Sequence, residues 1–262
     1  MGLLSGKNAL IFGVANKDSI AWGITKAFHR EGATLGISYA LEKLERRVQP
    51  LAEELDIDFV ERCNANDDTE IDALFAKAKD RFGTVDIMVH AIAYAEREDL
   101  DGLFVDTSRK GFSLALETSA YSLVALSQRA AKLMPNGGSI MTLSYYGAEK
   151  VMPHYNVMGV AKAALEASVR YLAFDLGPSQ IRVNAISAGP IKTLSASGIA
   201  GFRRMSAYAA DSSPLRTLVT QDDVGNMAVW LGSDWATMVT GETIYIDAGY
   251  HALGLHAPVD EL

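Results

Sequence analysis

Short apolar runs rich in β-branched residues alternate with amphipathic segments along most of the chain, and this alternation restricts the possible folds more than any other feature. Near-continuous apolar strands that alternate with helices are typical of a parallel sheet covered on both faces. We expect strands at Asn8–Val14, Thr34–Tyr39, Asp58–Cys63, Val85–Ala91, Ser139–Leu143, Ile181–Ile186 and Thr243–Asp247. We expect helices at Ile20–Glu31, Glu42–Leu55, Thr69–Phe82, Lys110–Leu133, Tyr155–Leu176 and Gln221–Leu231.

The pattern predicts an α/β fold of the doubly wound, Rossmann type, with a seven-stranded parallel sheet and helices on both faces. A chain of 262 residues with 49% hydrophobic content can bury one large core. We therefore expect one dinucleotide-binding and catalytic domain over residues 1–262. Pro50 should kink or interrupt the second helix. The segment Lys192–Asp211 is a long excursion from the carboxyl edge of the sheet, where ligands bind in such folds, and we expect a substrate-binding loop or helix there.

Composition excludes several kinds of partner. The formal net charge of −8 argues against nucleic acid, which requires a basic face. The single cysteine, Cys63, excludes an internal disulfide and a cysteine-based zinc site, and the five histidines lack ligand spacing, so no metal is expected. No apolar run approaches the roughly 20 residues that a membrane span needs. Since the start also lacks the apolar core of a secretory signal, we expect a cytoplasmic protein.

Tyr155 and Lys162 lie seven residues apart in a predicted helix, almost two turns, so both side chains leave the same face. A helical Lys leans toward the N-terminus, which aims its ammonium at the turn that carries Tyr155. A fixed cation makes a phenol more acidic and thus a better donor. Taken alone, the pair is better explained by a solvated Lys and a half-buried Tyr, so its meaning depends on the rest of the chain.

The first predicted strand ends at Gly13 and opens into a helix, a turn at which backbone N–H groups can approach a diphosphate. The usual G-x-G-x-x-G fingerprint is absent, and a plain strand-to-helix turn would explain Gly13 equally well. The second strand is followed by Ala40 and Leu41, where dinucleotide-binding folds commonly carry a carboxylate for the adenosine ribose or an Arg for the 2′-phosphate of NADPH. The absence of Arg favours NADH over NADPH. The basic residues nearby keep NADPH open: Lys43, Arg46 and Arg47.

Two further stretches place polar groups at the same edge of the sheet. The run from Leu143 to Gly147 puts hydroxyls at the end of one strand, and the run from Asn184 to Thr193 ends another strand in a Gly-Pro turn. Each could be an ordinary turn. Because the carboxyl ends of parallel strands meet at one edge, both stretches and the Tyr155–Lys162 helix form one predicted cluster.

With these motifs in place, the chain resembles the short-chain dehydrogenase/reductase superfamily, and in particular its divergent branch, the bacterial NADH-dependent enoyl-acyl-carrier-protein reductases. Three motifs support the resemblance, which runs from about Leu3 to Tyr250: Gly13-x5-Ser19-Ile20-Ala21-x-Gly23, Tyr155-x6-Lys162 and Ser187-Ala188-Gly189-Pro190-Ile191-x-Thr193. Most reductases of the superfamily use a Tyr-x3-Lys spacing, so this chain departs from them as the enoyl reductase branch does.

The resemblance implies roles for individual residues. Tyr155 would hydrogen-bond the thioester carbonyl, Lys162 would hold the nicotinamide ribose, and Tyr145 would be a second active-site tyrosine. The cofactor-binding residues that it implies are Gly13, Ser19, Ile20, Cys63, Asn64, Ala65, Ala91, Ile92, Ala93, Lys162, Ile191 and Thr193. The substrate-binding residues are Tyr94, Ala95, Tyr145, Tyr155, Met158, Phe202 and Met205.

The function implied is reduction of the trans-2 double bond of enoyl thioesters by NADH in bacterial type II fatty acid synthesis. The substrate would arrive on acyl carrier protein, a small acidic partner, for which Arg203 and Arg204 are the candidate contacts. The resemblance also implies a homotetramer. Two alternatives remain: another short-chain reductase acting on ketones or alcohols, and a catalytically silent dinucleotide-binding sensor.

Overall fold

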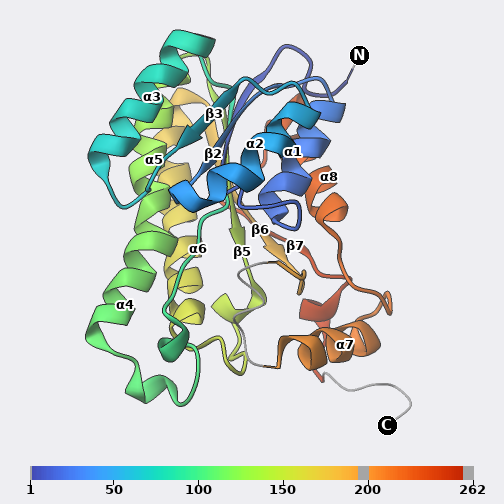
Figure 1. Ribbon diagram of the computed structural model, residues 1–262. Helices are drawn as coiled ribbons and strands as arrows, with labels where there is room; N and C mark the ends of the chain where they lie inside the picture. The colour runs from blue at the N-terminus through green and yellow to red at the C-terminus, as the bar shows by residue number, and fades with distance from the viewer. Residues whose placement is uncertain (1, 194–200, 256–262) are drawn as a thin grey trace.

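The computed structural model describes residues 2–193 and 201–255 and contains one seven-stranded sheet in the order β3-β2-β1-β4-β5-β6-β7. Every strand pair is parallel, as predicted. The predicted α/β doubly wound fold is therefore confirmed (Figure 1). The strands are β1 (Asn8–Phe12), β2 (Thr34–Tyr39), β3 (Phe59–Arg62), β4 (Ile87–His90), β5 (Gly138–Ser144), β6 (Ile181–Ala188) and β7 (Thr243–Ile246).

Helices cover both faces of the sheet, and each face has its own apolar core (Figure 1). On one face α1, α2 and α8 pack against the strands, with Trp22, Phe28 and Val224 among the buried side chains. On the other face α3, α5 and α6 bury side chains such as Phe75, Leu126 and Leu165. The helix bounds are α1 (Ile20–Arg30), α2 (Glu45–Glu54), α3 (Asp68–Phe82), α4 (Arg109–Leu116), α5 (Ser122–Ala130), α6 (Asn156–Leu176), α7 (Phe202–Ser212) and α8 (Gln221–Gly232).

Two helical predictions differ from the structure. The segment Lys110–Leu133 is not one regular helix: a π-helical stretch at Glu117–Tyr121 separates α4 from α5, and a 3-10 turn follows at Ala131–Leu133. The predicted interruption at Pro50 is wrong, because α2 continues through this residue. Pro50 is exposed, so the carbonyl that loses its N–H partner on the preceding turn can bind water instead.

The chain reverses its direction of winding between β1 and β4, which is where a doubly wound sheet opens a ligand crevice. Gly13 follows β1 at this point with φ +97°, a conformation that L side chains rarely adopt. A Cβ on Gly13 would lie 2.1 Å from the Ala91 carbonyl oxygen. Only glycine therefore lets the ends of β1 and β4 approach this closely.

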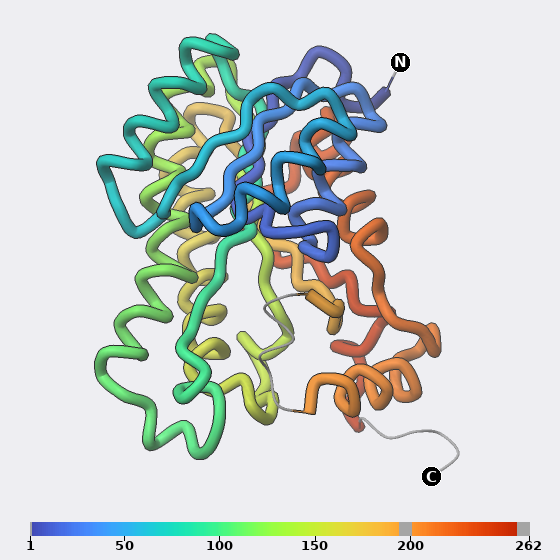
Figure 2. The backbone as a smooth tube through the Cα atoms, in the orientation of Figure 1, coloured from blue at the N-terminus to red at the C-terminus, as the bar shows by residue number. Residues whose placement is uncertain are grey.

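The helix α7 lies beyond the carboxyl ends of β6 and β7, below the sheet in the orientation of Figure 2. It belongs to the predicted excursion Lys192–Asp211. The residues Ser195, Ser197 and Gly198 of that excursion lie outside the described residues. Within residues 2–193 and 201–255, no helix is both long enough and apolar enough to cross a membrane.

Candidate active site

The carboxyl end of β5 brings two tyrosines together. Tyr145 follows the last residue of β5, and Tyr155 is the N-cap residue of α6. Their ring centroids are 4.9 Å apart and the planes meet at 72°, an edge-on contact that aromatic pairs favour. Glycine makes room for this arrangement, because a Cβ on Gly147 would lie 2.5 Å from the Tyr155 ring.

The backbone around Tyr155 is unusual. His154 and Asn156, on either side of it, have φ values of +61° and +34°. Asn and His tolerate this region better than most residues do. The Asn156 side chain donates to the carbonyl oxygens of Leu100 (3.1 Å) and Gly102 (3.3 Å). These bonds tie the loop that precedes α4 to the start of α6, directly beside Tyr155.

Lys162 lies on α6 and is buried, with 5% of its surface exposed. Its ammonium donates to the carbonyl oxygen of Leu143 in β5 at 2.6 Å. Burial lowers the pKa of Lys162 from 10.5 to about 8, and the charge of Glu166 acts in the opposite direction. Lys162 is therefore fixed at the same strand end as the tyrosine pair.

The expectation that Lys162 makes Tyr155 more acidic is wrong. Burial raises the pKa of Tyr155, and the neighbouring Tyr145 and Glu166 act in the same direction. Burial also raises the pKa of Tyr145. Both phenols are therefore neutral at physiological pH and keep their hydroxyl hydrogens. A neutral phenol can donate a hydrogen bond to an oxygen on which negative charge develops.

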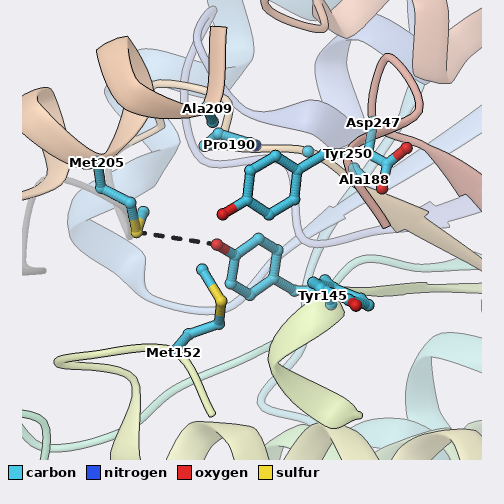
Figure 3. Close-up of a pocket in the computed structure, with 10 residues that line it drawn as sticks. Tyr145, Met152, Ala188, Pro190, Met205, Ala209, Asp247 and Tyr250 are labelled. Atoms are coloured by element: carbon cyan, nitrogen blue, oxygen red, sulfur yellow. Dashed lines mark hydrogen bonds between the residues drawn. The ribbon is translucent and has the colours of Figure 1, made fainter. Parts of the chain in front are cut away.

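A small, largely apolar pocket opens beside Tyr145, between the ends of β5 and β6 and the helix α7 (Figure 3). The Tyr145 hydroxyl lies 3.8 Å from the Met205 sulfur across this pocket. The pocket is lined by Tyr145, Tyr146, Met152, Ala188, Gly189, Pro190, Met205, Ala209, Asp247 and Tyr250. Of the predicted substrate-binding residues, it includes Tyr145 and Met205.

The other predicted substrate residues do not line this pocket. Met158 is buried on α6, and Phe202 is half-buried at the start of α7. Tyr94 is 48% exposed and its hydroxyl donates to Glu96 at 3.0 Å. Ala95, next to it, is half-buried.

The predicted diphosphate residues lie at the switch point. Ser19 is the N-cap residue of α1, but its side chain caps no amide of the first turn, which also lacks acidic residues. The N-terminus of this 11-residue helix therefore offers amides to an anion. Ile20, Ala91, Ile92 and Ala93 are half-buried close to the crevice, as are Ile191 and Thr193 after β6. The uncapped N-terminus of α1 thus fits the diphosphate of a dinucleotide.

The predicted adenine residues follow β3. Cys63 and Ala65 are buried, and burial raises the pKa of the Cys63 thiol to about 12, so this side chain is an apolar core residue. Asn64 is exposed, and its side-chain oxygen already accepts from the Asn66 amide at 3.2 Å. An amide oxygen has two lone pairs, so a second donor can still bind there.

Sequence reasoning missed a polar cluster behind Lys162. His90 is buried at the end of β4, and its two ring nitrogens lie 2.7 Å from the Thr142 hydroxyl and 2.8 Å from the Ser122 hydroxyl. Burial lowers the pKa of His90 to about 3, so the ring is neutral. Glu166, one turn beyond Lys162, is also buried and accepts from Ser144. No spacing motif in the sequence marks these partners.

In the part of the chain that the structure describes, no group of three or more His, Cys, Asp or Glu side chains could hold a metal ion. The site instead combines a glycine turn, an uncapped helix N-terminus, two neutral phenols and a buried lysine. On a doubly wound sheet, these features define the class of Rossmann-type dinucleotide-binding reductases.

The chain belongs to the enoyl-(acyl carrier protein) reductase family, whose model matches residues 13–251. A relative from Rhizobium meliloti, named enoyl-acyl-carrier-protein reductase (NADH) 1, is 52% identical over 256 residues, covering 98% of this chain and 94% of the relative. The family resemblance inferred from the motifs is confirmed.

Solved structures of enoyl-acyl carrier protein reductases share the fold of this chain. The Bacillus cereus enoyl-acyl carrier protein reductase with NADP+ and indole naphthyridinone superposes with a TM-score of 0.96 at 52% identity, over 97% of this chain and 100% of that one. The reductase from Anaplasma phagocytophilum in complex with NAD has a TM-score of 0.94 at 49% identity and covers 98% of each chain.

Proposed function

We propose that this protein reduces the trans-2 double bond of enoyl thioesters carried on acyl carrier protein, with NADH as the reductant. Besides family membership, one structural observation supports this proposal. The Tyr145 and Tyr155 rings meet 4.9 Å apart at the strand end where Lys162 is anchored. Two neutral hydroxyl donors and one cation thus lie beside the crevice in which a dinucleotide binds.

Tyr155 acts on the carbonyl oxygen of the thioester. Hydride addition at C3 places negative charge on this oxygen, and a donor that is already positioned stabilises the transition state more than the ground state. Because burial raises the pKa of Tyr155, the phenol remains a donor throughout the reaction. Tyr145 fixes the Tyr155 ring by its edge-on contact and borders the acyl pocket.

The coenzyme supplies the hydride when it is bound. The N-terminal amides of α1 would hold its diphosphate, and Lys162 would donate to the ribose hydroxyls. The pocket around Cys63, Asn64 and Ala65 would receive the adenine. NADH is favoured because the relatives are named for NADH. NADPH requires a parallel test, since the Bacillus cereus structure contains NADP+.

The test of this function is oxidation of NADH and NADPH, measured in parallel, with an enoyl thioester and with a ketone as substrates. We expect oxidation that depends on the enoyl thioester and is faster with NADH. Turnover of the ketone alone would assign the chain to the ketone reductases. Binding of NADH without any turnover would make it a sensor.

The acyl carrier protein would dock at α7. Arg203 and Arg204 are exposed there and directly precede Met205, which lines the pocket, and neither forms an ion pair with any residue that the structure describes. A local cationic patch on a net-acidic protein attracts an acidic partner. The part of Lys192–Asp211 that the structure describes would then form one wall of the substrate entrance.

Charge reversal of Arg203 and Arg204 to Glu should raise the apparent KM for carrier-linked substrate by roughly tenfold at low salt, because electrostatic attraction mainly affects encounter. The KM for a coenzyme A thioester should stay the same. The matched control is charge reversal of Arg46 and Arg47, two adjacent exposed arginines on α2, measured at saturating NADH. This control should leave both KM values unchanged. Equal changes for both substrates would contradict the docking role.

We also propose that the protein is a homotetramer in which α5 and α6 contribute to an interface. Large apolar side chains are exposed along this layer: Tyr121 at 58%, Tyr171 at 76% and Phe174 at 82%. Exposed apolar clusters of this kind mark protein interaction surfaces.

Phe174→Asp should convert the assembly to smaller species, since a symmetric interface repeats the buried charge in every copy. Light scattering coupled to size-exclusion chromatography would measure the mass. Leu215→Asp, at a residue 72% exposed outside this layer, is the control and should leave the mass unchanged. A monomeric wild type, or a tetrameric Phe174→Asp, would refute the proposed interface.

A further inference from the structure

Glu166 is a buried carboxyl that the mechanism above does not use. It lies on α6, one helical turn after Lys162, and only 7% of its surface is exposed. The Ser144 hydroxyl donates to it. A carboxyl is rarely buried to this extent unless it has a partner, because loss of hydration is costly for a charge.

Glu166 and Lys162 bind consecutive residues of β5. Lys162 donates a hydrogen bond to the carbonyl oxygen of Leu143, and Glu166 accepts one from the hydroxyl of Ser144. The next residue is Tyr145. Two side chains of opposite charge, one turn apart on the same helix face, thus hold the strand end that leads into the tyrosine pair.

The two charges support each other. Burial lowers the pKa of Lys162 to about 8, and the charge of Glu166 opposes this change. Burial raises the pKa of Glu166, while the Ser144 hydrogen bond and the charges of Arg170 and Lys162 oppose it. Each group would therefore be more readily neutral if the other were removed.

The other titratable groups packed around this pair are of two kinds. One kind is neutral at physiological pH: His90 on β4, which the charge of Lys162 affects, and Tyr155 at the start of α6, which the charge of Glu166 affects and which packs against Tyr145. Those that face Glu166 from outside are Arg170 on the same helix, Glu149 after β5 and Tyr245 on β7, whose hydroxyl donates to Glu149. Glu149 is exposed, so water screens its charge.

We propose that Glu166 is a positioning residue: its carboxylate is the buried counter-charge that keeps the Lys162 ammonium protonated and ready to bind the coenzyme ribose. The coenzyme part of this inference rests on the role proposed above for Lys162. The counter-charge itself does not, because it is a property of the protein without ligand.

The pH dependence has a definite sign. Lys162 loses its proton as pH rises through about 8, so coenzyme affinity falls on the alkaline side. Glu166→Gln keeps an oxygen that accepts from Ser144 but removes the negative charge. The Lys162 titration should therefore move to lower pH by about one unit, in line with a partly screened pair of opposite charges on adjacent turns of one helix. The pH at which NADH affinity falls to half should move by the same amount.

The decisive measurement is the ε-carbon NMR titration of Lys162 in 13C-lysine-labelled, coenzyme-free protein, with the signal assigned by its loss in Lys162→Arg. NADH affinity against pH, followed by fluorescence, is the second measurement. Glu149→Gln is the matched control, since it also removes a carboxylate but at an exposed residue, and it should not lower the midpoint. If Glu166→Gln does not fold, Glu166→Met provides the test, because it removes the same charge and places an apolar side chain in the buried site.

An unchanged Lys162 midpoint in the Glu166 variants, or an equal shift in Glu149→Gln, would overturn the proposal. A shifted midpoint supports the counter-charge whatever NADH does. If wild type also failed to bind NADH, the proposed function would fail while the counter-charge stood, so the two outcomes can be distinguished.

Discussion

Replacing Tyr155 by Phe is expected to lower kcat for enoyl-thioester reduction by roughly 10²–10³-fold, the loss seen when one positioned donor is removed from a developing oxyanion. The ring should keep its packing against Tyr145 and Gly147, because the substitution removes only the hydroxyl. NADH affinity should change little. The loss would then appear in kcat and not in coenzyme binding.

The matched control is Tyr171→Phe, on the same helix, which removes one exposed hydroxyl and keeps the ring that the proposed interface would bury. Its kcat should equal that of wild type. A Tyr155→Phe enzyme that keeps half or more of the wild-type kcat would show that another group stabilises the oxyanion, and Tyr145→Phe would be the next variant to measure.

Replacing Lys162 by Ala is expected to weaken NADH binding by roughly 10–100-fold, which corresponds to the loss of charged hydrogen bonds worth about 1.5–3 kcal/mol. The same change leaves Glu166 buried without its counter-charge and should lower the melting temperature. Both effects follow from one ammonium group that holds the strand end and that, in the proposed function, binds the coenzyme ribose.

The double variant Lys162→Ala/Glu166→Gln separates the two effects. Stability should recover, because no uncompensated charge remains, while NADH affinity should stay low. Lys150→Ala, at an exposed lysine, is the control for loss of a positive charge. Should Lys162→Ala bind NADH as tightly as wild type, the ribose role would be withdrawn, while the loss of stability would still measure the buried pair.

Much of the fold could be predicted because it depends on local patterns. The seven apolar runs became the seven strands, and the prediction of a parallel sheet follows from their alternation with helices. For several strands, the predicted carboxyl end lies one or two residues beyond the end that the structure shows. β1 stops at Phe12 because Gly13 already turns with positive φ, a conformation that hydrophobicity does not encode.

The candidate site was predicted less completely. The spacing of Tyr155 and Lys162 placed both on one helix face, but it could not show that Lys162 binds Leu143 or that burial would make Tyr155 less acidic. Those facts depend on β5, which is distant in sequence. The pocket beside Tyr145 gathers residues from several strand ends and α7, so only the motif residues among them could be named beforehand.

The bonds from Asn156 to the loop before α4 have a consequence for sequence variation. Asn156 holds the carbonyl oxygens of Leu100 and Gly102, not their side chains. Every amino acid carries the same backbone acceptor, so these bonds leave the side chain at Leu100 free to vary without releasing the loop, whereas Gly102, with φ +77°, is still restricted by its backbone conformation. Asn156 itself has no such freedom, because it must supply the amide donor and also tolerate a positive φ. Natural diversification of this enzyme is therefore expected to accumulate on the loop and to spare the residue that holds it.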